Sequence, residues 1–214
     1  MRFVKIDFEN GYPSEIEGTS EWYYCKMAKN NFCDLYEAEQ IIGDGHVYEG
    51  MNCVLIHFPD GKVFRPFETK ENVYVDAPVF WEDVLYFLVV DFVEKTIQIV
   101  AFDTKSYEKN VVAKLSLDEV KDCYNLMLRV APVLLVRDGN EKCLEAIWPE
   151  KKNFKMSNHE AFQFLDGDRM YFNEWYEDPD YHEMTIVRDW NTGEEIERFD
   201  GMLVRMQNGD VWRL

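Results

Sequence analysis

Basic side chains are scarce in this sequence of 214 residues. The chain has 23 lysine and arginine residues against 41 aspartate and glutamate residues, and its formal net charge is −18. Proteins that bind nucleic acid need a surface of lysine and arginine to neutralise phosphates, and the field of this chain repels them. Anionic membranes are repelled for the same reason. We therefore expect neither a nucleic-acid partner nor a membrane partner.

Long hydrophobic runs are also missing. The longest, residues 84–90, is far shorter than the roughly 20 apolar residues that a helix needs to cross a bilayer. The first residues, MRFVKIDFENGYPSE, carry charges at Arg2, Lys5 and Asp7 and lack the apolar core of a secretory signal. We expect a cytoplasmic protein.

Motifs for metals, cofactors and common catalytic groups are absent. The five cysteines include no C-x-x-C pair, and their odd number is typical of reduced, mostly buried thiols. The four histidines are scattered without zinc-ligand spacing. There is no glycine-rich phosphate loop and no G-x-S-x-G elbow. We predict no metal and no cofactor, and we expect a protein that is not an enzyme.

Aromatic residues are plentiful, and the hydrophobic residues come in short runs. The 15 Phe, 12 Tyr and 6 Trp favour strands. Residues 77–115 contain four apolar runs with a polar break after each of the first three, which predicts a four-stranded antiparallel unit. Its second run, residues 84–90, is apolar throughout, the third is interrupted by Gln98, and the fourth begins polar. Such a gradient from buried to exposed strands is typical of a propeller blade.

Similar units follow downstream. A second runs over residues 126–156 and a third over residues 161–199, each with four apolar stretches separated by turn residues. A shorter internal repeat occurs at residues 50–67 and 201–214. Each segment begins with Gly-Met, turns through Asp-Gly or Asn-Gly, and returns through an aromatic residue followed by an arginine. Ser116 and Glu119 form a capping-box pattern that predicts a short helical stretch to about Tyr124.

The N-terminal part is harder to interpret. Residues 2–8 alternate and predict a strand, and residues 21–28 and 32–42 are two β-rich runs joined by residues 29–31. Residues 35–42 fit either a strand or a short helix that ends at Gly43, and we favour the strand.

In layout the chain resembles β-propeller repeat proteins over about 140 residues, without a WD40 or kelch signature. We predict a single all-β domain over residues 1–214, a small propeller of about five four-stranded blades closed by N- and C-terminal strands. The repeat units lie near residues 18–49, 50–76, 77–117, 124–159 and 160–200, and residues 201–214 pair with the N-terminal strands. The alternative is a two-sheet β-sandwich or an open barrel.

Residues 173–183 combine carboxylates and aromatics around a predicted hairpin tip. Aromatic faces beside carboxylates bind sugars or cations, and paired carboxylates hydrolyse glycosides. The alternative is a solvated acidic hairpin. The ligand-binding candidates are Trp175, Tyr176, Tyr181 and His182, and the catalytic candidates are Asp91, Glu174 and Glu177. Asp91 ends the most apolar run, where burial would raise its pKa.

Two functions are therefore considered. The first is a non-catalytic cytoplasmic binding or scaffold protein that presents loop surfaces to a protein partner. The second is a carbohydrate-binding or glycoside-hydrolase-like protein that uses carboxylates near an axial pocket. Some five-bladed propellers are glycosidases or lectins, but fold analogy alone carries little weight.

Overall fold

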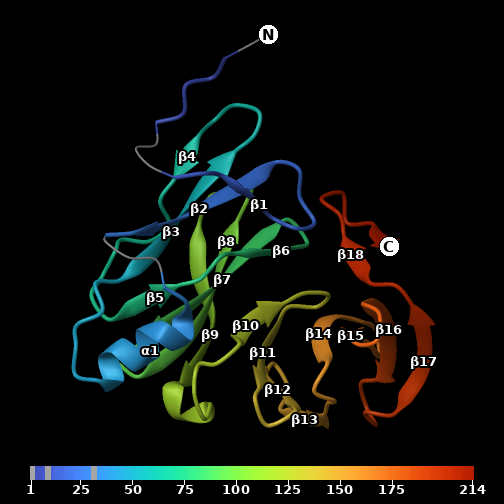
Figure 1. The fold of residues 1–214 in the computed structure, drawn as a ribbon. Helices are drawn as coiled ribbons and strands as arrows, with labels where there is room; N and C mark the ends of the chain where they lie inside the picture. The colour runs from blue at the N-terminus through green and yellow to red at the C-terminus, as the bar shows by residue number, and fades with distance from the viewer. Residues whose placement is uncertain (1–2, 8–10, 30–32) are drawn as a thin grey trace. The chain divides into compact units, whose positions relative to one another are not determined.

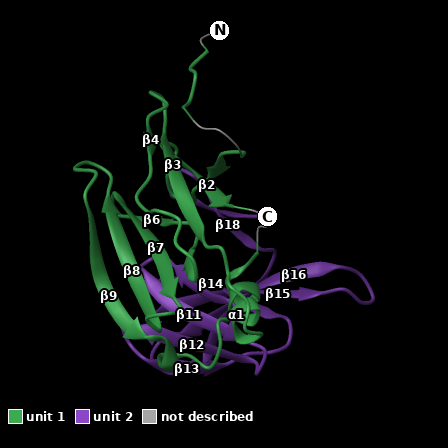
Figure 2. Ribbon diagram, turned by 90° about the vertical axis from the view of Figure 1, so that its left-hand side faces the viewer, with its two compact units in different colours: residues 1–123 green, residues 124–214 purple. Residues whose placement is uncertain are grey.

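The chain folds into two compact units of short antiparallel sheets. A computed structural model describes residues 3–7, 11–29 and 33–214, and it divides into unit 1, Met1–Cys123, and unit 2, Tyr124–Leu214 (Figure 2). Each unit is described separately below. No helix in the described part of the chain has the length and hydropathy that crossing a bilayer requires.

The first sheet of unit 1 has the order β1-β2-β3-β4 (Figure 1). Its strands are β1 (Ser14–Glu15), β2 (Trp22–Ala28), β3 (Met51–His57) and β4 (Val63–Phe64). β2 and β3 pair antiparallel from Trp22↔His57 to Ala28↔Met51. Residues 18–49 and 50–76, which we expected to be separate repeat units, thus contribute to one sheet.

A helix interrupts that sheet in the sequence. Residues 35–42 were predicted as a strand, and this is wrong, because α1 spans Leu35–Gly43. Asp34 caps the helix by accepting from the Glu37 N–H, while the Glu37 side chain accepts from the Asp34 N–H. Leu35 and Ala38 form its buried face. Phe32 and the last two residues of the predicted 29–31 turn lie outside the described residues.

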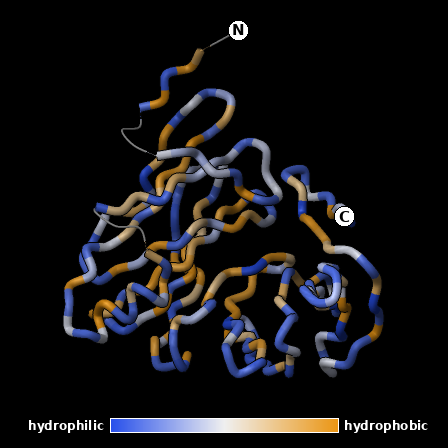
Figure 3. The backbone as a smooth tube through the Cα atoms, in the orientation of Figure 1, coloured by the Kyte–Doolittle hydropathy of each residue, from blue (hydrophilic) through white to orange (hydrophobic). Residues whose placement is uncertain are grey.

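The N-terminal segment was also predicted as a strand. Its ends, Arg2 and Phe8, lie outside the described residues, and residues 3–7 are not a strand. Figure 3 shows hydrophobic and hydrophilic colours following one another along this part of the backbone, beside the N-terminus. The strand prediction for residues 3–7 is therefore wrong, because these residues do not join the backbone hydrogen-bond ladder of a sheet.

The second sheet of unit 1 contains the predicted reference unit. Its strands are β5 (Val73–Val75), β6 (Val79–Trp81), β7 (Val84–Asp91), β8 (Thr96–Asp103) and β9 (Lys109–Ser116). Their order is β5-β7-β8-β9, and β6 also pairs with β7. β7 and β8 are largely buried and β9 is largely exposed, so the predicted gradient is confirmed. After Ser116 the chain forms only a 3-10 turn, η1 (Leu117–Glu119), instead of a helical stretch to Tyr124.

Unit 2 contains two four-stranded sheets and a hairpin. The third sheet has the order β10-β11-β12-β13, the fourth has the order β14-β15-β16-β17, and β18 pairs with β19. The strands of the third sheet are β10 (Leu126–Arg129), β11 (Leu134–Gly139), β12 (Cys143–Trp148) and β13 (Lys152–Lys155). The remaining strands are β14 (Glu160–Asp166), β15 (Arg169–Tyr176), β16 (His182–Asp189), β17 (Glu195–Asp200), β18 (Leu203–Arg205) and β19 (Val211–Arg213).

The sheets have the topology of propeller blades. Neighbouring strands in each sheet are antiparallel and follow one another in the chain, apart from the split inner edge formed by β5 and β6, so the fold is all-β and propeller-like. The described residues form four such sheets, and the predicted count of five blades is not supported. The predicted units 18–49 and 50–76 supply β2, β3 and β4 to one sheet and β5 to the next, and β18 and β19 form a sheet of only two strands. The single domain and the closure by strands from both chain ends stay predictions.

Each unit has its own hydrophobic core. In unit 1, side chains of both sheets, including Trp22, Leu55 and Phe87, pack into one cluster. In unit 2, side chains of the third and fourth sheets, including Leu144 and Phe172, do the same. Within each unit, the two larger sheets therefore pack against each other through their apolar side chains.

The two Gly-Met hairpins share a backbone feature. Gly50 and Gly201 both have φ +89°. A Cβ on Gly50 would lie 2.2 Å from the Lys70 carbonyl oxygen, and one on Gly201 would lie 2.1 Å from the Leu214 carbonyl oxygen. The two similar Gly-Met segments are therefore two hairpins of the same kind. In each, the chain that follows the second strand passes so close to the first glycine that a side chain would not fit there.

Candidate functional site

Two buried carboxylates face each other in the fourth sheet. Glu160 on β14 and Glu174 on β15 are directly paired across the strands, and each is 4% exposed. Arg188 Nη2 lies 2.5 Å from Glu160 Oε1, and Arg198 Nη1 lies 2.6 Å from Glu174 Oε2. Ser157 joins the two, because its N–H donates to Glu160 Oε2 and its hydroxyl donates to Glu174 Oε1. Like charges directly opposite one another are destabilising unless they are compensated in this way.

This network occupies the carboxylate oxygens of both residues. Each glutamate has a guanidinium partner and a hydrogen bond from Ser157. The Tyr176 phenol also forms a hydrogen bond with Glu174, and this bond raises the pKa of the phenol. Glu174, a predicted catalytic candidate, therefore has the contacts of a structural ion pair rather than those of a proton donor.

Aromatic rings stack beside the network. Tyr176 lies 4.8 Å from His182 with an interplanar angle of 11°, and 5.4 Å from His159 with an angle of 27°. His159 also meets Trp175 edge-on at 6.0 Å. The structure thus brings together Trp175, Tyr176 and His182, which the sequence proposed as ligand-binding residues, and adds His159 to them.

The β15–β16 connection forms an exposed acidic tip. Glu177, Asp178 and Asp180 are exposed, and none of them forms an ion pair within the described residues. Tyr181 is 65% exposed, and its hydroxyl donates to Glu183, which raises the pKa of the phenol. Figure 2 shows this hairpin extending beyond the other strands of unit 2. The carboxylates Glu174 and Glu177 therefore lie in different surroundings, one buried and one solvated.

A polar cavity of about 420 Å³ opens between the third and fourth sheets of unit 2. Trp175, Ser157 and Glu160 line it from the side of the fourth sheet. Three amide side chains also line it: Asn125, Asn140 and Asn158. The lining of this cavity thus combines several hydrogen-bonding side chains with one indole ring.

Asp138 on β11 also lines this cavity. Burial raises the pKa of its carboxyl, and the neighbouring Glu160 charge adds to the increase, whereas Arg129 and the Phe162 N–H oppose it. The sequence prediction missed both Asp138 and Glu160. A signal existed for Asp138, which stands in the Asp138-Gly139-Asn140 turn sequence, but none existed for the burial of Glu160.

Asp91 belongs to unit 1. It is 9% exposed, and its Oδ1 accepts from the N–H groups of Val93 and Glu94, while Lys70 Nζ lies 3.0 Å from Oδ2. Burial raises the pKa of this carboxyl, but the hydrogen bonds and the Lys70 charge outweigh burial and lower the pKa overall. The expectation that a buried Asp91 has a raised pKa is therefore wrong. Asp91 closes the β7–β8 turn.

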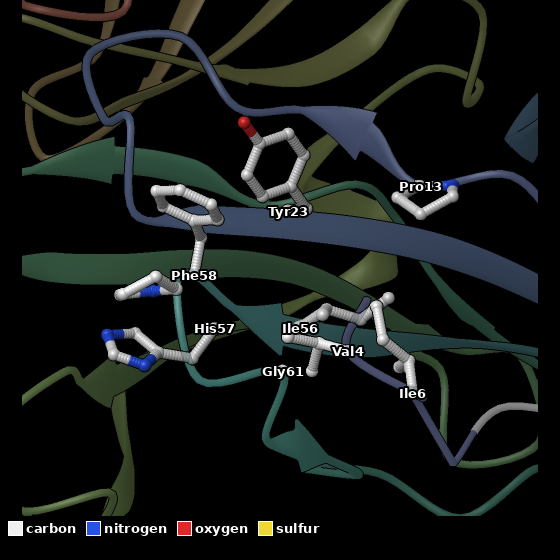
Figure 4. Close-up of a pocket in the computed structure, with 9 residues that line it drawn as sticks. Val4, Ile6, Pro13, Tyr23, Ile56, His57, Phe58 and Gly61 are labelled. Atoms are coloured by element: carbon white, nitrogen blue, oxygen red, sulfur yellow. The ribbon is translucent and has the colours of Figure 1, made fainter. Parts of the chain in front are cut away.

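An apolar pocket of about 280 Å³ lies at the other end of unit 1. Figure 4 shows Val4, Ile6 and Ile56 lying together beside Gly61, with the rings of Tyr23 and Phe58 nearby. Val4 and Phe58 are exposed, whereas Ile56 is buried. His57, whose Nδ1 lies 2.8 Å from Asp60 Oδ1, also lines this pocket, and the lining is otherwise mostly apolar.

Within the described ranges, no group of three or more His, Cys, Asp and Glu side chains is arranged to hold a metal ion. The described cysteines are Cys25, Cys33, Cys53, Cys123 and Cys143, and all are unbridged. The predicted site residues thus divide into a turn cap in unit 1 and a cluster in unit 2 that joins an ion-pair network, a ring stack and an acidic tip.

Comparisons with known proteins do not assign the chain to a family. No protein-family model matches the sequence, and no curated protein is similar to it.

Proposed function

We propose that the chain is a non-catalytic binding protein and that the β15–β16 hairpin presents its binding surface to a basic segment of a protein partner. The observation that carries the proposal is the tip itself. Three exposed carboxylates without a cationic partner in the described structure stand next to the exposed Tyr181 ring. Lysine and arginine side chains of a partner neutralise such carboxylates and also pack against aromatic rings.

The rest of the cluster supports a binding role. The Glu160–Arg188 and Glu174–Arg198 pairs fix the strands from which the tip extends. The stack of His159, Tyr176 and His182 fixes the ring orientations near its base. A recognition surface on rigid strands loses less conformational entropy on binding than one on a flexible loop.

The test is a variant that removes the charge of the tip and leaves its shape. The variant E177Q/D178N/D180N is compared with the wild type in affinity capture from the native cell, followed by titration of the captured protein. We expect about tenfold or greater weakening, and an affinity of the wild type that falls with increasing salt.

The matched control is D166N/D168N/E194Q, which removes the same charge from exposed turns of the same sheet. Equal weakening by both variants would mean that only net charge matters. A partner that binds both as tightly as the wild type would exclude the hairpin as the binding surface.

A second candidate function is carbohydrate binding in the polar cavity of unit 2. The amide lining together with Trp175 favours it, since sugar hydroxyls pair with amides and sugar rings stack on indoles. A glycan array tests this function, with Trp175→Ala against Trp212→Ala as the control on the exposed C-terminal hairpin. Binding that is lost only in the Trp175 variant supports it, and a wild type that binds no glycan contradicts it.

A further inference from the structure

Another cavity of unit 1 has more basic than acidic side chains in its lining, unlike the chain as a whole. It has a volume of about 490 Å³ and lies against one face of the second sheet. Val73 and Val75 of β5 and Val89 of β7 form its floor. Val75 is paired directly with Val89 across the strands, so these side chains form an aliphatic patch, which Asp91 and Gln98 border as the cross-strand partners of Val73 and Val89. Its size lies within the usual range for sites that bind small molecules.

The rim of this cavity is basic in a strongly acidic chain. Arg65, Lys70 and Lys109 line it, against only two carboxylates, Glu68 and Asp91. Asp91 is already satisfied by two backbone N–H groups and by Lys70. Since acidic residues outnumber basic ones by 41 to 23 in the whole chain, the local balance is reversed here.

Two of these cations lack a carboxylate partner in the described part of the chain. Arg65 Nη2 donates to the carbonyl oxygen of Asp7, and Lys109 Nζ donates to that of Pro66. Lys109 Nζ also lies 4.8 Å from the centre of the Phe67 ring. A guanidinium has five N–H donors and an ammonium has three, so both groups keep donors for a ligand. These contacts hold both cations at the rim, and the oxygens that they contact within the described residues are uncharged carbonyl oxygens.

We propose that this cavity binds a small organic anion that combines a carboxylate with an apolar body. The aliphatic floor removes the apolar part from water, so each CH₂ group that is buried there strengthens binding. The two uncompensated cations form charge-assisted hydrogen bonds with the carboxylate. Nucleotides fit less well, because the lining offers one aromatic ring, which Lys109 already covers.

The probe is octanoate, titrated into the full chain by calorimetry and by ligand-observed NMR. Octanoate is compared with 1-octanol, which lacks the charge, and with acetate, which lacks the apolar body. We expect octanoate to bind about tenfold or more tightly than either. Equal binding of octanol and octanoate would overturn the proposal, and so would the absence of octanoate binding at millimolar concentration.

The variant R65Q/K109Q locates the site. Both side chains are at the surface, so the fold is retained, and circular dichroism verifies it. We expect octanoate affinity to fall about tenfold or more while octanol affinity stays unchanged. The control R169Q/K155Q removes one exposed arginine and one exposed lysine of unit 2 and should bind octanoate like the wild type. Octanoate binding that survives in R65Q/K109Q would also overturn the proposal.

Discussion

Asp91 of unit 1 and Glu174 of unit 2 occupy similar places but are stabilised differently. Each lies at or near the end of the second strand of its sheet, β7 or β15, and each is buried. Asp91 accepts two hydrogen bonds from backbone N–H groups only two and three residues further along the chain. Glu174 relies on Arg198, which is 24 residues away, and on Ser157. One carboxylate closes a turn, and the other ties strands together.

The difference separates local from long-range stabilisation. Asp103 and Asp189 repeat the Asp91 pattern at the end of the third strand of their sheets, where each accepts from the N–H groups two and three residues later. Hydrogen bonds to these N–H groups lower the pKa of both carboxyls. Such turn caps depend on neighbours in the sequence and can be exchanged individually. The Glu160–Glu174 network depends on four strands at once, so removing one member exposes the others to an uncompensated charge.

The largest effect is expected for Arg188→Met. This change leaves the fully buried Glu160 carboxylate without its guanidinium, and breaking such a pair costs about 3–5 kcal/mol of unfolding free energy. Urea unfolding at pH 7 measures it. Arg169→Met is the matched control, because Arg169 pairs with Glu197 on the exposed surface of the same sheet and should cost almost nothing. A loss for Arg188→Met as small as that of the control would refute the structural role of the network.

A smaller loss is expected for Arg198→Met. Glu174 then keeps its hydrogen bonds from Ser157 and from the Tyr176 phenol, and Arg198 is itself partly exposed, so water replaces part of the interaction. Hydrogen bonds to charged groups contribute about 1.5–3 kcal/mol, and urea unfolding should show a loss of that order. The double variant Arg198→Met/Glu174→Gln should recover part of the stability. If the double variant is less stable than the sum of both single changes, the proposed pairing is wrong.

Asp91→Asn is expected to cost less again. The amide keeps one acceptor oxygen for the turn, but the two backbone N–H groups no longer donate to a charged group and the Lys70 ion pair is lost, so we expect a cost of about 1–2 kcal/mol at pH 7. Because Lys70 is exposed, Lys70→Met should account for only a minor part of this loss. Thermal or urea unfolding of both variants provides the measurement. A Lys70→Met variant that loses as much as Asp91→Asn would show that the ion pair, and not the turn cap, is the dominant contribution.

The smallest effects are those of pH, and they have opposite signs in the two units. The folded-state pKa of Asp91 is lowered, so its contribution is present above the unfolded carboxyl pKa of about 3.9 and is lost as the pH falls through the folded value. The pKa of Asp138 is raised, so its burial lowers stability as the pH rises through the folded value.

Unfolding free energies between pH 2 and pH 7 measure these two contributions. Asp91→Asn should flatten the loss of stability on the acid side. Asp138→Asn should be at least as stable as the wild type at pH 7 and should lose this advantage at low pH. If Asp138→Asn is destabilised at neutral pH, its carboxyl is stabilised in its charged form, contrary to the structure.

The same contrast between local and distant contacts explains which parts of the fold could be predicted from the sequence. The strands of residues 77–115, the two later repeat units and the Gly-Met hairpins were predicted, because apolar runs and turn residues are local signals. A short helix ending at Gly43 was the alternative for residues 35–42, but the strand was favoured because the run is β-rich, although Asp34 and Glu37 form a capping box. The count of five blades, which rested on chain length divided by a typical blade length, is not supported, because β2 and β3 lie in one sheet although helix α1 separates them in the chain.

The candidate site was predicted in part. Glu174, Trp175, Tyr176 and His182 were chosen because they are adjacent in the sequence, and the structure places them together. Their partners Arg188, Arg198 and Glu160 come from other strands, and no spacing rule connects residues 24 or 28 positions apart. The burial of a glutamate on β14 could not be predicted, since its charge argues for an exposed position.

The paired glycines limit how this chain can diverge. Gly50 and Gly201 stand where any side chain would collide with a carbonyl oxygen of the backbone that follows each hairpin. A descendant of this sequence can exchange the turn residues of either hairpin, lengthen the turns or alter their charge. It cannot replace either glycine without moving the segment that ends in Lys70 or Leu214. In distant relatives these two glycines should therefore outlast most of the surface, and they are the positions by which such relatives can be recognised.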